Sequence, residues 1–213
     1  MSVLAAALLT SAVGLVEPAV EPRRAPQLSY PEALVEGDIV FRTGSDALSG
    51  LVLAHSKGSR FSHVGVLLRI ADQWLIIHST PAESGAEGGV HTESLEAFAS
   101  SEGTQRLGVY RIDEMSSRQR QSMKDYLLSQ LGKPFDYRFQ YSDNSAHYCT
   151  ELVLKALDHA GVNLEPAMRR VHVLTLTEAA IPPDSLAWSS HLREVTPNPP
   201  ISGLPSAAAD RQR

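Results

Sequence analysis

The sequence lacks most of the residue patterns that identify common protein classes. It contains one cysteine, Cys149, among 213 residues, which excludes an intramolecular disulfide and any metal site built from several cysteines. Lysine and arginine form no run, and the formal net charge is -5 at pH 7. We therefore expect no nucleic-acid partner. The apolar run at residues 3–16 is too short to span a bilayer, so we expect no stable membrane span.

The length and the 43% hydrophobic content suit one domain with a full core and short extensions. Residues 3–16 have the length of the hydrophobic region of a secretory signal peptide, although no lysine or arginine precedes them. The interpretation is a signal peptide and polar linker over residues 1–26, a domain over 27–195 and a disordered tail over 196–213. The expected location is periplasmic or extracellular, with the cytoplasm as the alternative.

Hydrophobic periodicity predicts an α+β fold with a central hairpin. Residues 62–70 and 73–78 are predicted strands joined by a turn at Ala71 and Asp72. Other predicted strands lie at 36–42, from Val90 onward and at 108–112, with a helical turn at 93–98 and a loop at 81–89. Predicted helices lie at 45–55, at 116–131 behind a serine cap, and from Pro182 onward.

Cys149 begins a further predicted helix that ends at Gly161. In the first turn of this helix, unpaired backbone N–H groups and the helix dipole favour the thiolate, which makes Cys149 a candidate nucleophile. The alternative is a buried structural cysteine, because free cysteine is among the most buried residue types. The helical spacing rests on Leu152, Val153, Ala156, Leu157 and Ala160.

A cysteine nucleophile needs a base, and histidine suits that role because its pKa lies near neutrality. His63 and His78 stand in the two strands of the predicted hairpin, toward the same open end, so one can orient the other. Glu83 and Glu151 are alternatives for the orienting group, although Glu151 also suits the helix N-terminus. A zinc site of His63, His78 and Cys149 is chemically conceivable, but no short ligand spacing supports it, and the expectation is no metal.

Four short motifs follow one another along the chain. They are GDIVFR at 37–42, FSHVGV at 61–66, LGKPFDY at 131–137 and YCTELV at 148–153, with IPPDSL at 181–186 behind them. In this order, with the histidine before the cysteine, the sequence resembles the YiiX/YebB-like branch of the NlpC-type cysteine hydrolases. The papain-like fold of that superfamily is circularly permuted, and the resemblance covers roughly residues 36–195.

The resemblance implies a small antiparallel barrel-like sheet packed against helices, with Cys149 as nucleophile and His63 as general base and acid. His78 falls at the position of the third polar residue, where relatives often have a glutamate. Backbone N–H groups near Cys149 are the expected oxyanion donors, and Tyr148 either adds a hydroxyl or only packs. No cofactor is implied.

The expected activity is cleavage of an amide bond, in a cell-wall peptide or an acylated amino acid, through a thioester. One alternative is a lipid-directed acyltransferase or thioesterase, for which Leu48, Leu51 and Val52 are candidates to line a groove. The other alternative is a binding module that has lost its chemistry.

Overall fold

The structure is a computed structural model that describes residues 34–44, 58–82, 87–100, 104, 106–172 and 178–195. The predicted signal peptide and linker, the predicted helix at 45–55 and the predicted tail lie outside these ranges. Glu83, Leu48, Leu51 and Val52 lie outside them as well.

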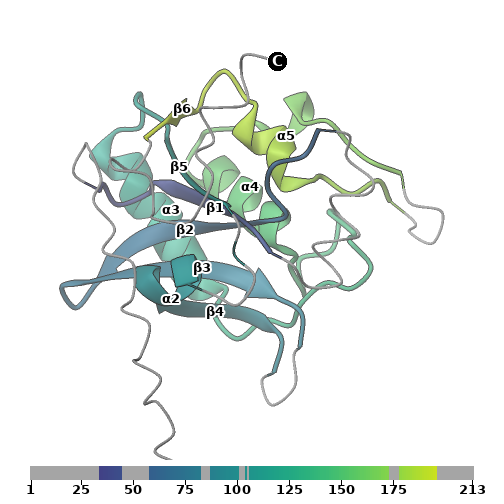
Figure 1. Ribbon diagram of the computed structural model, residues 1–213, viewed down its shortest axis with the longest axis horizontal. Helices are drawn as coiled ribbons and strands as arrows, with labels where there is room; N and C mark the ends of the chain where they lie inside the picture. The colour runs from purple at the N-terminus through teal and green to yellow at the C-terminus, as the bar shows by residue number, and fades with distance from the viewer. Residues whose placement is uncertain are drawn as a thin grey trace, which may run out of the picture.

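Six antiparallel strands form one sheet in the order β4-β3-β2-β1-β5-β6 (Figure 1). Their bounds are β1 (Ile39–Thr43), β2 (His63–Ile70), β3 (Gln73–Thr80), β4 (Gly89–Ser94), β5 (Arg106–Arg111) and β6 (Arg193–Glu194). The predicted α+β class is confirmed. The sheet is antiparallel, as expected, but it is open rather than closed into a barrel, because β4 and β6 form its two edges within the described chain.

The predicted hairpin is present as β2 and β3. Ile70 pairs with Gln73, and the two residues between them, Ala71 and Asp72, have φ angles of 47° and 64°. Two consecutive positive φ values are typical of the tight turns whose twist matches that of the flanking strands. This turn sets the register that brings the far ends of both strands together.

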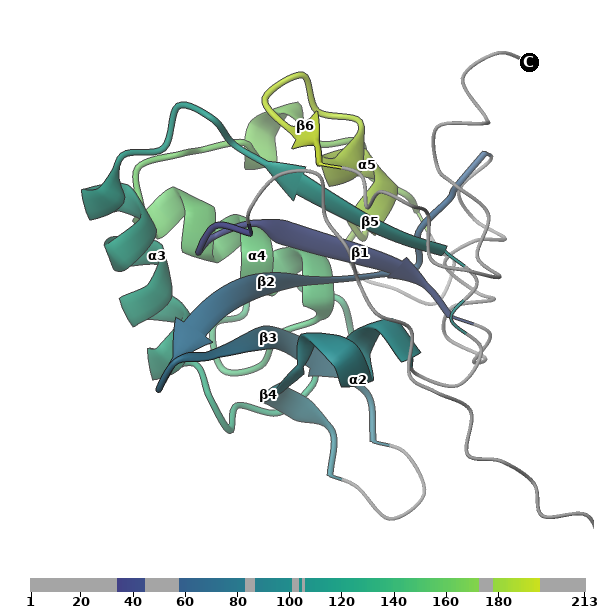
Figure 2. The same cartoon turned by 60° about the vertical axis from the view of Figure 1, so that its left-hand side comes forward.

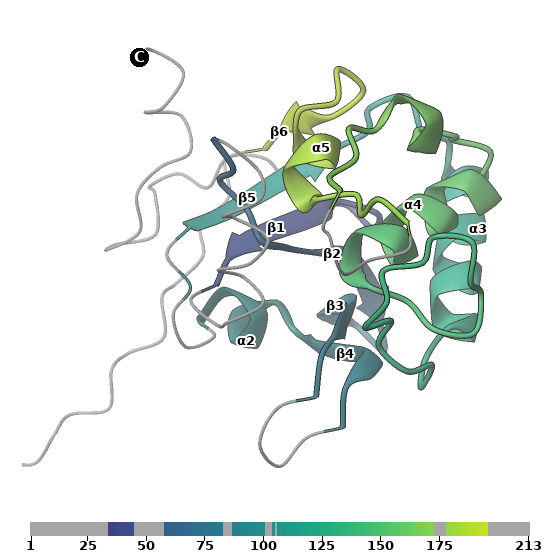
Figure 3. The same ribbon diagram turned by 90° about the vertical axis from the view of Figure 1, so that its right-hand side faces the viewer.

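Helices cover both faces of the sheet. Helix α2 (Leu95–Ser100) lies against one face, while α3 (Ser117–Ser129), α4 (Cys149–His159) and α5 (Pro183–Ala187) lie on the other (Figure 2). Figure 3 shows the strands between α2 and the larger helical layer. A short 3-10 helix, Glu165–Ala167, follows α4.

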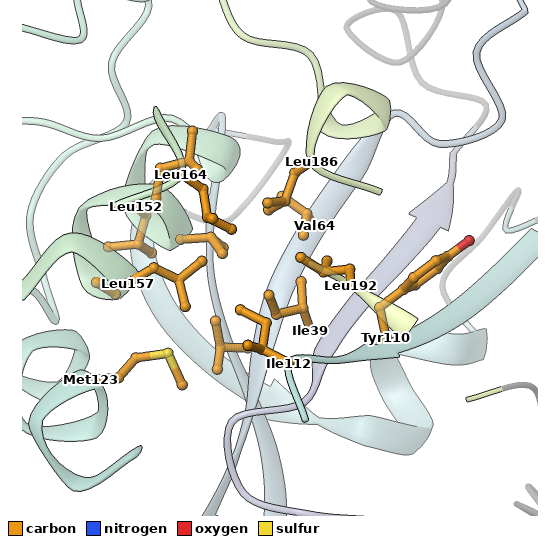
Figure 4. Close-up of a cluster of buried hydrophobic side chains, with 14 of the residues drawn as sticks. Ile39, Val64, Tyr110, Ile112, Met123, Leu152, Leu157, Leu164, Leu186 and Leu192 are labelled. Atoms are coloured by element: carbon orange, nitrogen blue, oxygen red, sulfur yellow. The ribbon is translucent and has the colours of Figure 1, made fainter. Parts of the chain in front are cut away.

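The larger part of the core lies between the sheet and the helical layer. Every second residue of β1 and β2 faces α4, including Ile39 and Val64, and both side chains are fully buried (Figure 4). The alternate residues pack against α2 in a second cluster around Phe98. This alternation is the period of a strand covered on both faces.

Several predicted boundaries differ from the structure by two or three residues, and the two that bear on the site concern β4. The strand continues to Ser94 before α2 begins, so Glu93 lies in a strand rather than in the predicted helical turn. Gly89 pairs with Thr80, which shortens the predicted loop at 81–89. Pairing with β3 extends the strand at both ends, and this pairing leaves no local signal in the sequence.

A buried ion pair fixes the start of β1. The Asp38 carboxylate is fully buried and accepts from Arg111 Nε at 2.7 Å and from a second Arg111 nitrogen at 2.8 Å. It also accepts from the Val35 backbone N–H at 2.9 Å. A second bidentate pair, Arg193–Asp113, has a similar shortest distance of 2.6 Å but is about half exposed.

We expect Asp38→Ala to lower the free energy of unfolding by about 3–5 kcal/mol, because it removes the buried carboxylate from a bidentate pair with Arg111. Asp113→Ala removes an equally well-formed but exposed pair and is expected to cost no more than about 1 kcal/mol. Urea unfolding of both variants measures the difference. Equal losses would show that burial does not set the strength of the Asp38 pair.

Candidate active site

Cys149 is the first residue of α4, as predicted, and its side chain is partly exposed. The Glu151 carboxylate caps the helix by accepting from the Tyr148 backbone N–H at 3.2 Å. Unpaired N–H groups of the first helical turn therefore surround the thiol, as expected for a helix N-terminus.

The thiol lies where β2 and β3 separate. Their ladder runs from Ile70↔Gln73 to Val66↔Ile77 and stops there, although both strands continue beyond it. In the unpaired stretch, the Val64 backbone N–H faces the Cys149 sulfur closely enough to lower the pKa of the thiol, and Ser79 Oγ donates to the His147 carbonyl at 2.6 Å. The segment that ends in Cys149 is thus anchored to both strands beside His63 and His78.

The two predicted histidines form a direct contact. His63 Nε2 lies 2.7 Å from His78 Nδ1, and the other nitrogen of His78, Nε2, lies 3.3 Å from Glu93 Oε1. His91 is paired with His78 in the register of β3 and β4, and their ring centroids are 4.4 Å apart. The row Glu93–His78–His63 therefore crosses three neighbouring strands and ends at the strand segment that touches Cys149.

The side chains of Cys149 and His63 do not hydrogen-bond to each other in this state. The sulfur lies 3.9 Å from Thr150 Oγ1, while the His63 ring packs beside Phe98 with centroids 5.7 Å apart. The two residues are neighbours through the backbone of β2, and His63 Nδ1 remains without a hydrogen-bond partner among the described residues. Catalytic hydrogen bonds are often open in the absence of substrate.

Burial sets the protonation state of the site. It lowers the pKa of His63 well below 6.5, with further lowering by the positive charge of Arg42 and by His91. Burial likewise lowers the pKa of His78, with smaller contributions from His63, His91 and Arg42.

Burial also raises the pKa of the Cys149 thiol. The Thr150 hydroxyl and the backbone N–H groups of Val64, Thr150 and Cys149 offset this effect only in part. The predicted effect of the helix N-terminus is present, because the Thr150 and Cys149 N–H groups lower the pKa of the thiol, but burial outweighs it in the free protein. At neutral pH the site holds a thiol and neutral imidazoles.

Two other sequence candidates have structural partners. The Tyr148 hydroxyl accepts from the Ile181 backbone N–H at 3.4 Å, and the ring packs on Phe139, so its packing role is the one that the geometry supports. Glu151 lies 3.1 Å from His147 Nδ1 and 2.7 Å from Lys155 Nζ, so it does not orient His63.

The sequence analysis missed Glu93 and Asp184. Asp184 in α5 accepts from the Arg60 and Phe61 backbone N–H groups at 2.7 and 3.0 Å, which holds the chain just before it enters β2. A signal for Glu93 exists in the alternation of β4, which places His91 and Glu93 on one face of the sheet. Asp184 belongs to the IPPDSL motif, but no local pattern shows what it binds.

The described ranges hold neither a metal cluster nor a membrane-spanning helix. No group of three or more His, Cys, Asp or Glu side chains there has a geometry that could hold a metal ion. None of the helices described is long and apolar enough to cross a bilayer. A cavity of about 870 Å³ lies beside α5 and β6, lined by Arg60, Tyr110 and Trp188 among others, and none of the predicted catalytic residues lines it.

Comparison with known proteins shows the family and the fold of the chain. Residues 33–198 match the model of a family described as permuted papain-like amidase enzymes, YaeF/YiiX, C92 family. The chain belongs to this family. The predicted YiiX-like branch and the class of cysteine peptidase or amidase are thereby confirmed.

One solved structure carries the same fold. It is described as the metalloprotein YiiX from Escherichia coli O157:H7, and it superimposes with a TM-score of 0.63 at 21% sequence identity. The match covers 76% of this chain and 96% of that one. No curated protein matches the chain.

The lowered pKa values of the histidines predict acid sensitivity. The unfolded chain binds protons near pH 6.5 and the folded chain does not, so stability is complete above that pH and falls as the pH drops below it. Each histidine contributes up to about 1.4 kcal/mol per pH unit. Urea unfolding between pH 5 and 7 is expected to show a smaller slope in His78→Gln, whereas the exposed control His191→Gln should keep the wild-type slope. An unchanged slope in His78→Gln would contradict the assignment.

Proposed function

We propose that this family member hydrolyses an amide bond through a thioester on Cys149, with His63 as general base and acid and His78 as the group that orients His63. The observation that carries the proposal is the buried His63–His78 contact of 2.7 Å at the point where β2 and β3 part, with the segment that leads into Cys149 bonded to β3 through Ser79 and the His147 carbonyl. The family assignment supports amidase chemistry at the site.

The proposed steps use one proton and one nucleophile. His63 Nδ1 accepts the thiol proton while the sulfur attacks the carbonyl carbon, and the carbonyl oxygen becomes an oxyanion. Backbone N–H groups at the start of α4 are the proposed donors to that oxyanion. His63 then gives its proton to the departing amine. The acyl group remains bound to the Cys149 sulfur as a thioester. Water attacks the thioester as His63 takes a proton from it, and that proton returns to the sulfur when the acid leaves.

In the free protein both the Cys149 thiol and the His63 ring are neutral. This state favours removal of the thiol proton during attack on the substrate over an ion pair that forms beforehand. Burial opposes both the thiolate and the imidazolium. A substrate that brings the His63 ring and the thiol together allows the charges to form only where the reaction needs them. The open pair in the free protein fits this order of events.

For the substrate we propose a small peptide or an acylated amino acid, with cell-wall peptides as the first class to examine. Export to the periplasm or the exterior, proposed from residues 1–26, would place the enzyme with such peptides. Lipid-directed acyl transfer and an inactive binding module remain as the alternatives that the experiments must separate.

Alkylation of the single thiol is the first test of the pair. We expect iodoacetamide to modify Cys149 at pH 7 at least about tenfold faster in the wild type than in His63→Ala, because only the wild type has a base beside the partly buried thiol. In the variant, modification should require a higher pH than the alkylation of an ordinary thiol requires. His191→Ala, which removes an exposed histidine, is the control. Identical pH profiles in all three proteins would contradict the pair.

Trapping the acyl-enzyme tests the reaction itself. Wild-type protein is mixed with a panel of cell-wall peptides, N-acyl amino acids and glycerophospholipids, quenched in acid and analysed by intact mass spectrometry. We expect a covalent acyl adduct on Cys149 from a peptide or acyl amino acid, and none with His63→Ala. An adduct from the lipids alone would favour the acyltransferase alternative. No adduct and no turnover with any compound would favour the binding module.

A further inference from the structure

The His63–His78 pair has a carboxylate at its outer end. Glu93 reaches His78 from β4, the edge strand, and its Oε1 lies 3.3 Å from His78 Nε2. From this contact we infer that Glu93 is a positioning residue, which fixes the proton positions on both rings so that His63 presents a bare Nδ1 to the thiol. The inference rests on the proposed pairing of His63 with Cys149.

The Glu93–His78 contact is a charge contact at 3.3 Å that lacks the alignment of a hydrogen bond in this conformation. A bare ring nitrogen and a carboxylate oxygen repel each other at this distance, and a carboxylate only accepts, so His78 Nε2 carries its hydrogen on the side of Glu93. In a neutral ring, His78 Nδ1 is then the acceptor, and the hydrogen in the 2.7 Å contact must belong to His63 Nε2. The remaining nitrogen of His63, Nδ1, is left with its lone pair free. That nitrogen has no hydrogen-bond partner among the described residues, and the proposed mechanism needs it as the base.

Neighbouring groups do not replace Glu93 in this row. His91 lies beside His78, but its Nδ1 is 3.0 Å from the Gly89 carbonyl and therefore already has an acceptor. Phe98 from α2 packs on both rings and carries no charge. Without Glu93, nothing in this arrangement decides which nitrogen of His78 holds its hydrogen.

Arg42 opposes Glu93 from the other side of the pair. It is the register partner of His63 in β1, and its guanidinium lies 4.8 Å from the Phe98 ring centroid. The groups that face the two rings are thus Arg42 from β1, the two histidines themselves from β2 and β3, and His91 and Glu93 from β4. Removing the negative charge and removing the positive charge should move the titration of the pair in opposite directions.

Nitrogen NMR of the histidine rings tests the inference without any substrate. At pH 7.5 the wild type is expected to show both rings with hydrogen on Nε2 and bare Nδ1, with the signals assigned by comparison with His63→Gln and His78→Gln. Glu93→Gln keeps a hydrogen-bond acceptor, so His63 and His78 should each keep the wild-type tautomer. Glu93→Leu has no acceptor and should populate the Nδ1–H form, and its alkylation at pH 7 should fall about tenfold. Glu96→Leu, an exposed change on α2, is the control.

Charge is separated from hydrogen bonding by titration. Glu93→Gln should lower the midpoint of His78 protonation, and Arg42→Met should raise it, whereas a merely structural role predicts no such opposition. Hydrogen on Nδ1 of either ring in the wild type, or unchanged tautomers in Glu93→Leu, would overturn the inference. If Glu93→Leu fails to fold, an unchanged midpoint in Glu93→Gln would overturn it instead.

These outcomes are distinct from a failure of the proposed function. If alkylation of Cys149 does not depend on His63, the hydrolase proposal fails even where the tautomers follow Glu93. If alkylation depends on His63 but the tautomers do not change in the Glu93 variants, the hydrolase proposal is retained and the proposed role of Glu93 is rejected.

Discussion

The early end of the β2–β3 ladder is the constraint on which the candidate site depends. Strands that stayed paired to their ends would use the Val64 N–H within the sheet and leave no place for another chain segment. Because pairing stops at Val66↔Ile77, a backbone donor and the Ser79 hydroxyl are released toward the start of α4. The sheet therefore supplies the hydrogen bonds that hold the cysteine segment, and the two histidines stand on either side of the opening.

A second, fully buried polar cluster holds the same segment from the helical side. His147 lies between Glu151 and Gln130, at 3.1 and 3.0 Å, and Lys155 completes the partners of the carboxylate. Buried charges are tolerated only when they are paired and hydrogen-bonded. The residues just before Cys149 are thus held by directional contacts on both sides, from the sheet and from the helical layer.

The sequence was sufficient for those parts of the site that local patterns encode. The helix behind Cys149, the hairpin and the placement of His63 and His78 on its strands follow from period, turn chemistry and one conspicuous thiol. Glu93 was assigned to a helical turn, because the pairing of β4 with β3 depends on a partner strand and not on its own residues. Asp184 contacts a backbone N–H 123 residues away, and no periodicity reports such a contact. The protonation state also escaped prediction, because burial outweighs the helix N-terminus and burial is a property of the whole fold.

The order of the elements along the chain decides when the parts of the candidate site are synthesised during translation. Both histidine strands precede α4 in the chain, so the ribosome delivers His63 and His78 well before Cys149. A nascent chain that has reached only β5 lacks both Cys149 and the helix that covers the sheet. The proposed site is therefore completed only when α4 packs against β2 and β3, and an incomplete translation product cannot react through Cys149.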